Sequence, residues 1–235
     1  RVAEFWKNTA TALYQLEPQP EKYLFCENNS IDESISYYKR YNRPKELIRL
    51  WFKDNALDEL ATPFDLIAIV RQTLLTRLRQ LDPDYAIFLD SDILVESHNM
   101  IQIITGQKVA DCDIVGGAYL RPYPQGYYLA ALWKGAPFKL RNYPPKKYGP
   151  VEAVGGGCMC LSRRVIQDKS LDFYPIGIPE ASEDYGYCLK AKERGYKIYL
   201  DASIRLKHYV TQHHVDGKSW RVDQKGQHLP FKYGV

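Results

Sequence analysis

The stretch Tyr85-Ala86-Ile87-Phe88-Leu89-Asp90-Ser91-Asp92 joins a short apolar run directly to two aspartates spaced one residue apart. The apolar run predicts a buried β-strand over Tyr85–Leu89. Successive side chains of a strand point to opposite faces, so Asp90 and Asp92 can converge on one cation as the chain leaves the sheet. Hard divalent ions prefer such oxygen ligands and can hold a diphosphate. The stretch therefore predicts a ligand site at the carboxyl edge of a sheet, although the same pattern also fits a solvated turn.

Strands and helices alternate along most of the chain, which predicts an α/β fold. The pair Thr62-Pro63 supplies an N-cap and a proline at the first position of a helix whose period continues over residues 66–81. Another helix is expected to begin after Ser182 and to stop at Gly195, with a strand following over residues 197–209. We therefore expect a three-layer α/β/α sandwich around a mostly parallel mixed central sheet.

Prolines, glycines and tyrosines crowd residues 119–150. That density predicts irregular backbone, with an edge strand or hairpin arm at residues 127–133 as the exception. A strand is expected over residues 152–162, interrupted by three consecutive glycines. These glycines fit either a close approach of the backbone to a bound sugar or a β-bulge.

The size and composition of the chain restrict its function. Its 235 residues fit one catalytic domain, which we place at residues 1–210, with residues 211–235 as a tail or extension. A net charge of +4, spread among acidic residues, does not indicate a nucleic-acid partner. No stretch approaches the roughly 20 apolar residues of a membrane span. The five cysteines lie mainly in apolar runs, which predicts free thiols and a cytoplasmic location, with association at a membrane surface left open.

Taken in chain order, these motifs resemble the glycosyltransferases of the GT-A fold, and most closely the large family 2 group. The resemblance covers about residues 4–208 and rests on four matches. The matching segments are Glu27-Asn28-Asn29-Ser30-Ile31-Asp32, Arg71-Gln72, Phe88-Leu89-Asp90-Ser91-Asp92, and Ser182-Glu183-Asp184 with the later Gly195-Tyr196-Lys197 and His208. The family's first strand normally precedes the helix expected near Glu4, so we expect the chain to continue before Arg1.

The resemblance implies a site for a divalent metal, Mn²⁺ or Mg²⁺, and a nucleoside-diphosphate sugar. Asp92 and His208 are then direct metal ligands, and Asp90 contacts the metal through water or holds the ribose. On the residues alone, His208 fits an ordinary core or surface histidine as well. The nucleotide is expected to contact residues from three of the matching segments, namely Glu27, Asn28, Arg71, Asp90 and Ser91.

Transfer to a hydroxyl also needs a base, and a carboxylate shielded from water can serve. We assign Asp184 to this role, with Glu183 as the second choice, while noting that both acids would also stabilise a helix N-terminus. The donor sugar or the acceptor is expected to contact Gly155, Gly156 and Gly157. Trp133 offers an aromatic face for a sugar ring, although its segment also fits a plain surface loop.

The sequence thus predicts a metal-dependent glycosyltransferase that moves a sugar from a UDP- or GDP-sugar to a glycan, lipid or small-molecule acceptor, with inversion. Two alternatives remain. A sugar-nucleotide pyrophosphorylase shares the sheet and a metal, and a catalytically inactive sugar-nucleotide-binding module would keep the fold without turnover.

Overall fold

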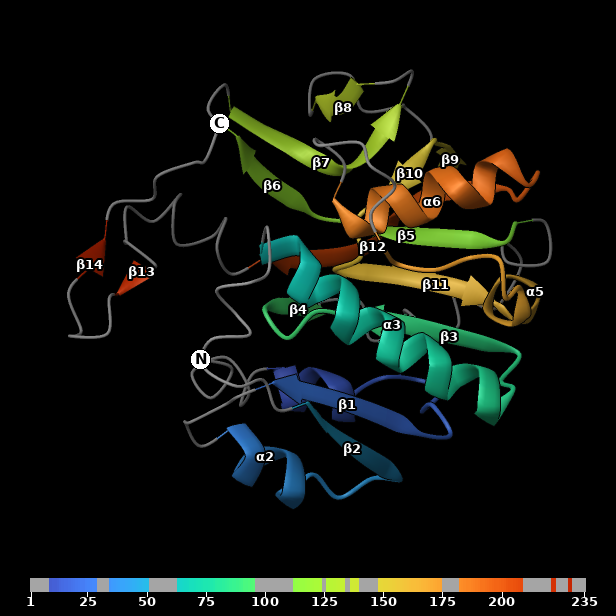
Figure 1. Ribbon diagram of the computed structural model, residues 1–235. Helices are drawn as coiled ribbons and strands as arrows, with labels where there is room; N and C mark the ends of the chain where they lie inside the picture. The colour runs from blue at the N-terminus through green and yellow to red at the C-terminus, as the bar shows by residue number, and fades with distance from the viewer. Residues whose placement is uncertain are drawn as a thin grey trace.

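A six-stranded mixed sheet forms the centre of the molecule (Figure 1). The computed structural model describes residues 9–28, 34–50, 63–95, 112–123, 126–133, 136–139, 148–174, 182–208, 221–222 and 228–229. Its central strands run in the order β3-β11-β5-β12-β4, and β9 pairs with β12. Their bounds are β3 Tyr85–Leu89, β4 Ile93–Val95, β5 Ile114–Ala118, β9 Tyr148–Pro150, β11 Cys158–Ser162 and β12 Ile198–His208.

The prediction of a mostly parallel sheet is wrong for these strands. Within this sheet β12 pairs with β5 in parallel, whereas the pairings β11–β3, β11–β5, β12–β4 and β12–β9 are antiparallel. The reason lies in the connections. β11 is reached from a second sheet rather than by a helical crossover, so it can enter between β3 and β5 in the opposite direction. The broader prediction of a mixed α/β fold is confirmed.

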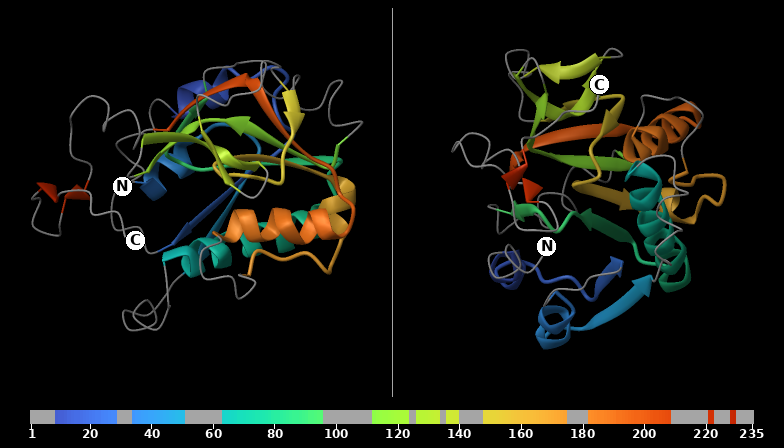
Figure 2. Two further views of the ribbon diagram at one scale, coloured as in Figure 1. Left: turned by 90° about the horizontal axis from the view of Figure 1, so that it is seen from above. Right: turned by 60° about the vertical axis from the view of Figure 1, so that its left-hand side comes forward.

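Helices α3 (Pro63–Leu81), α5 (Arg163–Gln167) and α6 (Glu183–Glu193) lie on one face of the sheet, as Figure 1 shows. Seen from above, α3 and α6 lie on one side and the blue N-terminal helical segments on the other (Figure 2, left). The alternation along β11 explains this arrangement, since Met159 and Leu161 join the core under the helices while Cys158 and Cys160 join a second core.

The N-terminal part forms a parallel pair of strands, β1 (Tyr23–Asn28) and β2 (Lys45–Leu50), beside the short helix α2 (Ser34–Arg40). Residues 9–14 are helical, and they lie within residues 4–16, whose apolar spacing predicts a helix. Aromatic rings fill the space between these elements. Phe25 stacks on Tyr38 at 5.0 Å between ring centroids, and Tyr41 meets Tyr23 edge-on at 5.1 Å.

The stretch over residues 119–150, which we predicted to be mostly irregular, contains strands. β6 (Leu120–Tyr123), β7 (Gly126–Trp133) and β8 (Ala136–Lys139) form a second sheet with β10 (Ala153–Val154). Within this sheet β7 pairs with each of the others, so it is central rather than an edge strand. Prolines are tolerated here because Pro122 and Pro137 lie on β6 and β8, which pair with β7 on one side.

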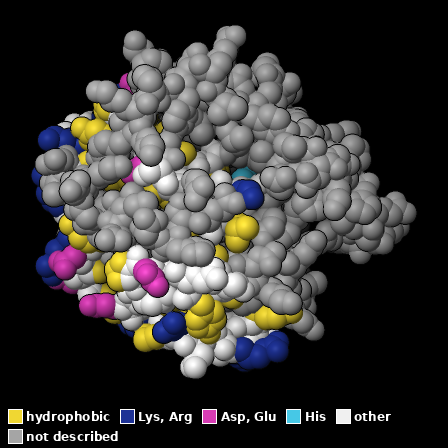
Figure 3. Space-filling view, turned by 180° about the vertical axis from the view of Figure 1, so that it is seen from behind, with side chains coloured by type: hydrophobic (Ala, Val, Ile, Leu, Met, Phe, Trp, Pro, Cys, Tyr) yellow, Lys and Arg dark blue, Asp and Glu magenta, His cyan; other side chains and the backbone are white. Residues whose placement is uncertain are grey.

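All five cysteines are free, as predicted, and burial raises the pKa of the Cys158 thiol to about 12. None of the described helices has the length and apolar character that a membrane span requires. Residues 97–107, whose sequence pattern also predicts a helix, lie outside the described residues. In the predicted tail, β13 (Arg221–Val222) pairs with β14 (His228–Leu229). On the described part of the face in Figure 3, acidic and basic side chains are interspersed.

Candidate functional site

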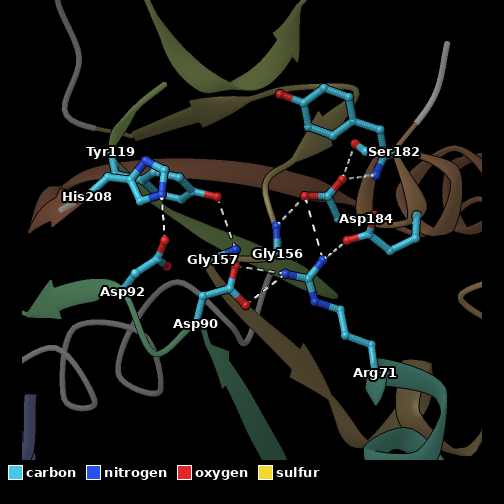
Figure 4. A network of polar contacts seen from close by, with 11 residues as sticks. Arg71, Asp90, Asp92, Tyr119, Gly156, Gly157, Ser182, Asp184 and His208 are labelled. Atoms are coloured by element: carbon cyan, nitrogen blue, oxygen red, sulfur yellow. Dashed lines mark hydrogen bonds and ion pairs between the residues drawn. The ribbon is translucent and has the colours of Figure 1, made fainter. Parts of the chain in front are cut away.

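Three strand ends meet at one edge of the central sheet. Leu89, the last residue of β3, pairs with Cys158 at the start of β11, and the Asp90 amide donates to the Gly157 carbonyl over 3.1 Å. On the neighbouring side, His208 ends β12 directly opposite Ile93 of β4. This register brings the aspartate segment, the glycine turn and the terminal histidine together, as Figure 4 shows.

The two aspartates do not converge on one point, which corrects the expectation from strand geometry. The strand ends at Leu89, and the Ile93 amide donates to the Asp90 carbonyl over 3.1 Å, so residues 90–93 form a turn. In a turn, residues i and i+2 no longer share a face. Asp92 faces His208, whereas Asp90 faces Arg71 (Figure 4).

Asp92 and His208 are in direct contact, with 3.1 Å between the carboxylate Oδ2 and Nε2 of the imidazole. Burial alone would raise the pKa of Asp92, but the hydrogen bond and charge of His208 hold it below the usual value. The Tyr119 ring lies edge-on to the imidazole at 5.7 Å, and its hydroxyl accepts the Gly157 amide hydrogen over 3.0 Å. The sequence analysis missed Tyr119, because a single tyrosine after a strand carries no motif.

Arg71 lies at the centre of an acidic cluster and is buried, with 5% of its side chain exposed. Its Nη2 donates to both oxygens of Asp90, at 2.8 and 2.9 Å, and its Nη1 forms an ion pair with Glu183. Nη1 also lies 3.8 Å from Oδ2 of Asp184. Burial opposes the charge on Arg71, yet the three carboxylates raise its pKa above the usual value. Arg71 is therefore a fixed cation between the two acidic segments.

The acidic pair opens helix α6, and both members are buried. Asp184 accepts the Gly156 amide hydrogen over 2.7 Å through Oδ2, while Oδ1 accepts the Ser182 hydroxyl and the Tyr185 amide. Glu183 differs from its neighbour. Its Oε2 has no hydrogen-bond partner among the described residues, and burial together with the charge of Asp184 raises its pKa to about 7 against the opposing effect of Arg71.

The three glycines form a buried turn between β10 and β11, so they connect two sheets rather than form a bulge within one strand. A Cβ atom on Gly156 would overlap the Arg71 guanidinium, and one on Gly157 would lie 2.6 Å from the Tyr119 hydroxyl. Glycine is required here because these two side chains of the protein approach the backbone. Whether Gly155 and its neighbours also contact a sugar stays a prediction.

The remaining predicted residues come from β1, the aspartate turn and β7. Glu27 is buried at the end of β1 and accepts a hydrogen bond from Nε of Arg49 over 2.7 Å, a partner that the sequence analysis did not single out. Asn28 ends β1, and the Ser91 carbonyl lies 3.5 Å from the Thr9 hydroxyl. Trp133 ends β7, but its side chain lies outside the described part of the structure.

A metal at this site would draw on Asp92 and His208. Together they offer one oxygen and one nitrogen donor, a combination that fits Mn²⁺. Asp90 is occupied by Arg71. Accordingly, among the described residues no group of three His, Cys, Asp or Glu side chains is arranged to hold a metal ion. The donor set thus fits part of a coordination shell, made of the two residues predicted as direct ligands, while Asp90 faces Arg71.

The described residues define a Rossmann-like mixed α/β fold, and solved structures share it. Over 96% of this chain, GalNAc-T7 with UDP, GalNAc and Mn²⁺ is similar at a TM-score of 0.54 and 14% identity, and the match covers 48% of the GalNAc-T7 chain. CMP:2-keto-3-deoxy-manno-octonic acid synthetase in complex with CTP matches over 84% of this chain and 78% of its own, with a TM-score of 0.51 and 12% identity.

Protein A197 from STIV matches over 80% of this chain and 84% of its own, with a TM-score of 0.51 and 17% identity. No protein-family model matches the chain, and no curated protein sequence does so either. At these low identities, the similarity to the solved structures concerns the fold alone.

Proposed function

We propose that this protein is a metal-dependent glycosyltransferase of the GT-A type that uses a nucleoside-diphosphate sugar. The observation that carries the proposal is the meeting of Asp92 and His208 with the buried acidic pair at one edge of the sheet, linked through Asp90 and Arg71. A pair of possible metal ligands beside a shielded carboxylate provides the two functions that sugar transfer needs. The fold likeness to GalNAc-T7, whose structure holds UDP, GalNAc and Mn²⁺, supports the same reading.

The donor diphosphate is expected at Asp92 and His208, with the nucleobase toward Glu27 and Asn28 at the end of β1. Bound Mn²⁺ or Mg²⁺ would neutralise charge on the leaving diphosphate. Asp90 is predicted either to contact the metal through water or to hold the ribose, and Ser91 of the same turn is a further predicted nucleotide contact. Because both UDP- and GDP-sugars present a diphosphate, the proposal covers either donor.

In the transfer step, the acceptor hydroxyl oxygen forms a bond to the anomeric carbon as the bond from that carbon to the donor's phosphate oxygen breaks. The bonding electron pair leaves with the nucleoside diphosphate, and the hydroxyl proton passes to a carboxylate. We assign Asp184 as that base, with Glu183 as the alternative. The acceptor, a glycan or a lipid-linked or small molecule, is expected to contact Trp133 and the glycine turn.

Donor hydrolysis and transfer assays test this proposal. The expected result is turnover of at least one UDP- or GDP-sugar that requires Mn²⁺ or Mg²⁺ and is lost in Asp92→Ala. Glu46→Gln, which changes a partly exposed carboxylate that pairs with Lys22 and Arg77, is the matched control and should keep wild-type turnover. Binding without turnover of any donor would instead identify an inactive binding module.

A nucleotidyltransferase is the second candidate, because the CTP-bound synthetase shares the fold at a similar TM-score. The two activities differ in their products. A nucleotidyltransferase given a nucleoside triphosphate and a sugar substrate releases pyrophosphate, whereas a glycosyltransferase given a nucleotide sugar releases a nucleoside diphosphate. Release of pyrophosphate with no nucleoside diphosphate would replace the first proposal by the second.

A further inference from the structure

We propose that Arg71 is a positioning residue that fixes the distance between the aspartate turn and the acidic pair, in place of the nucleotide contact that its sequence position suggests. The inference rests on the proposed function for its catalytic consequence. Its structural content stands on the contacts of Arg71 alone. Figure 4 shows the guanidinium between Asp90 on one side and the start of α6 on the other.

Both terminal nitrogens of the guanidinium are already engaged within the protein. Nη2 alone contacts both oxygens of Asp90, and Nη1 faces Glu183 and Asp184. Because the guanidinium is planar, contacts to different acids through its two terminal nitrogens fix its orientation as well as its charge. Because the side chain is almost fully buried, the guanidinium balances carboxylates that would otherwise repel one another in a medium of low dielectric constant.

The glycine turn holds the same guanidinium from a third direction. A Cβ atom at Gly156 would overlap it, so the turn and Arg71 are in close contact. The Gly156 amide in turn donates to Asp184 over 2.7 Å. Arg71 on α3 therefore contacts the chain after β3, the chain before β11 and the first turn of α6. The guanidinium is the group that sets how far the predicted base lies from the predicted metal ligands.

The first experiment compares Arg71→Met and Arg71→Lys with Arg77→Met. Arg77 lies on the same helix and also pairs with a carboxylate, but it is partly exposed. A positioning role predicts that the Arg71 variants bind UDP without metal as the wild type does, while kcat at saturating donor falls about 100-fold or more. Arg77→Met keeps wild-type kcat. A metal-free Kd for UDP that weakens about tenfold, with kcat retained, would overturn the inference in favour of a nucleotide contact.

Stability supplies a readout that does not depend on activity. Removing Arg71 leaves Glu183 buried beside other carboxylates, so the double variant Arg71→Met with Glu183→Gln should unfold at higher urea than Arg71→Met alone. Equal midpoints would contradict the inference. If the coupling is present but the wild type turns over no nucleotide sugar, the proposed function fails while the positioning of the two acidic segments by Arg71 stands.

If the Arg71 variants do not fold, Gly156→Ala tests the same contact while the charge remains. The added Cβ should displace the guanidinium and lower kcat, with metal-free UDP binding retained. Gly186→Ala is the matched control, because nothing lies within 4 Å of its Cβ position. Equal kcat values for the two alanine variants would overturn the inference.

Discussion

Helix α3 carries two arginines that pair with carboxylates. The surroundings of each pair decide whether the pKa of its carboxylate falls or rises. Arg77 binds Glu46 through two hydrogen bonds of 2.7 and 2.9 Å while 33% of its side chain is exposed. Its hydrogen bond, aided by Lys22, lowers the pKa of Glu46 to about 2. Arg71 pairs with Glu183, yet burial and Asp184 raise the pKa of Glu183 to about 7. In the buried pair of Arg71 and Glu183, desolvation and not pairing therefore decides the direction of the pKa shift.

The acids paired with Arg71 and Arg77 also differ in what they can do. Glu46 is partly exposed, is ionised at pH 7 and pairs with two cations, Lys22 and Arg77. Arg71 links the buried acids to the turn that carries Asp90 and Asp92. The raised pKa of Glu183, the alternative base, suits proton transfer, whereas a carboxylate whose pKa is lowered to about 2, such as Glu46, is a weak base.

The largest expected effect is on catalysis by the buried acidic pair. Asp184→Asn should lower transfer by about 10²–10⁴-fold, because the proton of the acceptor hydroxyl then has no carboxylate to receive it. Glu46→Gln, in the partly exposed pair with Arg77, should not change the rate of transfer. Steady-state assays of nucleoside diphosphate release provide the measurement. Should Glu183→Gln be the inactive variant while Asp184→Asn stays active, the two acids exchange roles.

Arg71→Met should cost about 3–5 kcal/mol of unfolding free energy, since it leaves buried carboxylates without their cation. Arg77→Met should cost much less, because solvent screens its partner. Urea unfolding followed by circular dichroism compares the two. Similar losses of unfolding free energy at both positions would mean that burial does not distinguish the two arginines.

The glycine turn sharpens the comparison through packing rather than charge. Gly156→Ala should destabilise the protein by about 1–3 kcal/mol, because its Cβ overlaps Arg71. Gly186→Ala, within α6, should instead gain up to about 1 kcal/mol from helix propensity. Thermal unfolding of both variants tests this, and a destabilised Gly186→Ala would show that the first effect is not specific to Arg71.

The smallest expected effect is a pH dependence of stability that has opposite signs for Glu183 and Glu46. The pKa of Glu183 is raised on folding, so its contribution to stability is full at low pH and is lost as the pH rises from about 4.5 to about 7. Glu46, with a lowered pKa, contributes above about 4.5 and loses that contribution as the pH falls toward 2. Denaturation between pH 5 and 8 should therefore show a decline that Glu183→Gln reduces and Glu46→Gln leaves in place.

Local signals in the sequence were sufficient for the regular elements near the site. The apolar run of β3 and the signals at Ser182 and Gly195 for α6 are properties of a few neighbouring residues, and Gly195 has the expected positive φ of 81°. Asp92 and His208 were expected at one site, as two ligands of a metal ion, from chain order and the family resemblance, and the two side chains lie in direct contact. The helix and strand signals need no knowledge of which strands lie side by side, whereas the contact of Asp92 with His208 depends on the pairing of β12 with β4.

The rest depended on packing between distant segments. The antiparallel entry of β11 follows from a connection through the second sheet, whose prolines and glycines concealed its strands. Arg71 meets Glu183 across 112 positions, and no local pattern predicts that contact. The strand ends at Leu89 as predicted, but the hydrogen bond from the Ile93 amide to the Asp90 carbonyl folds residues 90–93 into a turn, so Asp90 and Asp92 do not share a face.

The irregularity in β12 has a consequence for sequence length. The pairing of β12 with β5 shifts between Asp201 and Arg205, and Asp201 accepts both the amide and the hydroxyl of Ser203, at 2.8 and 2.6 Å. Deleting one residue within 202–204 would bring Tyr209 opposite Ile93 and turn His208 to the other face of the sheet. Such a deletion should abolish Mn²⁺ binding while the sheet still folds. In this strand the number of residues, as much as their identity, is a constraint on function.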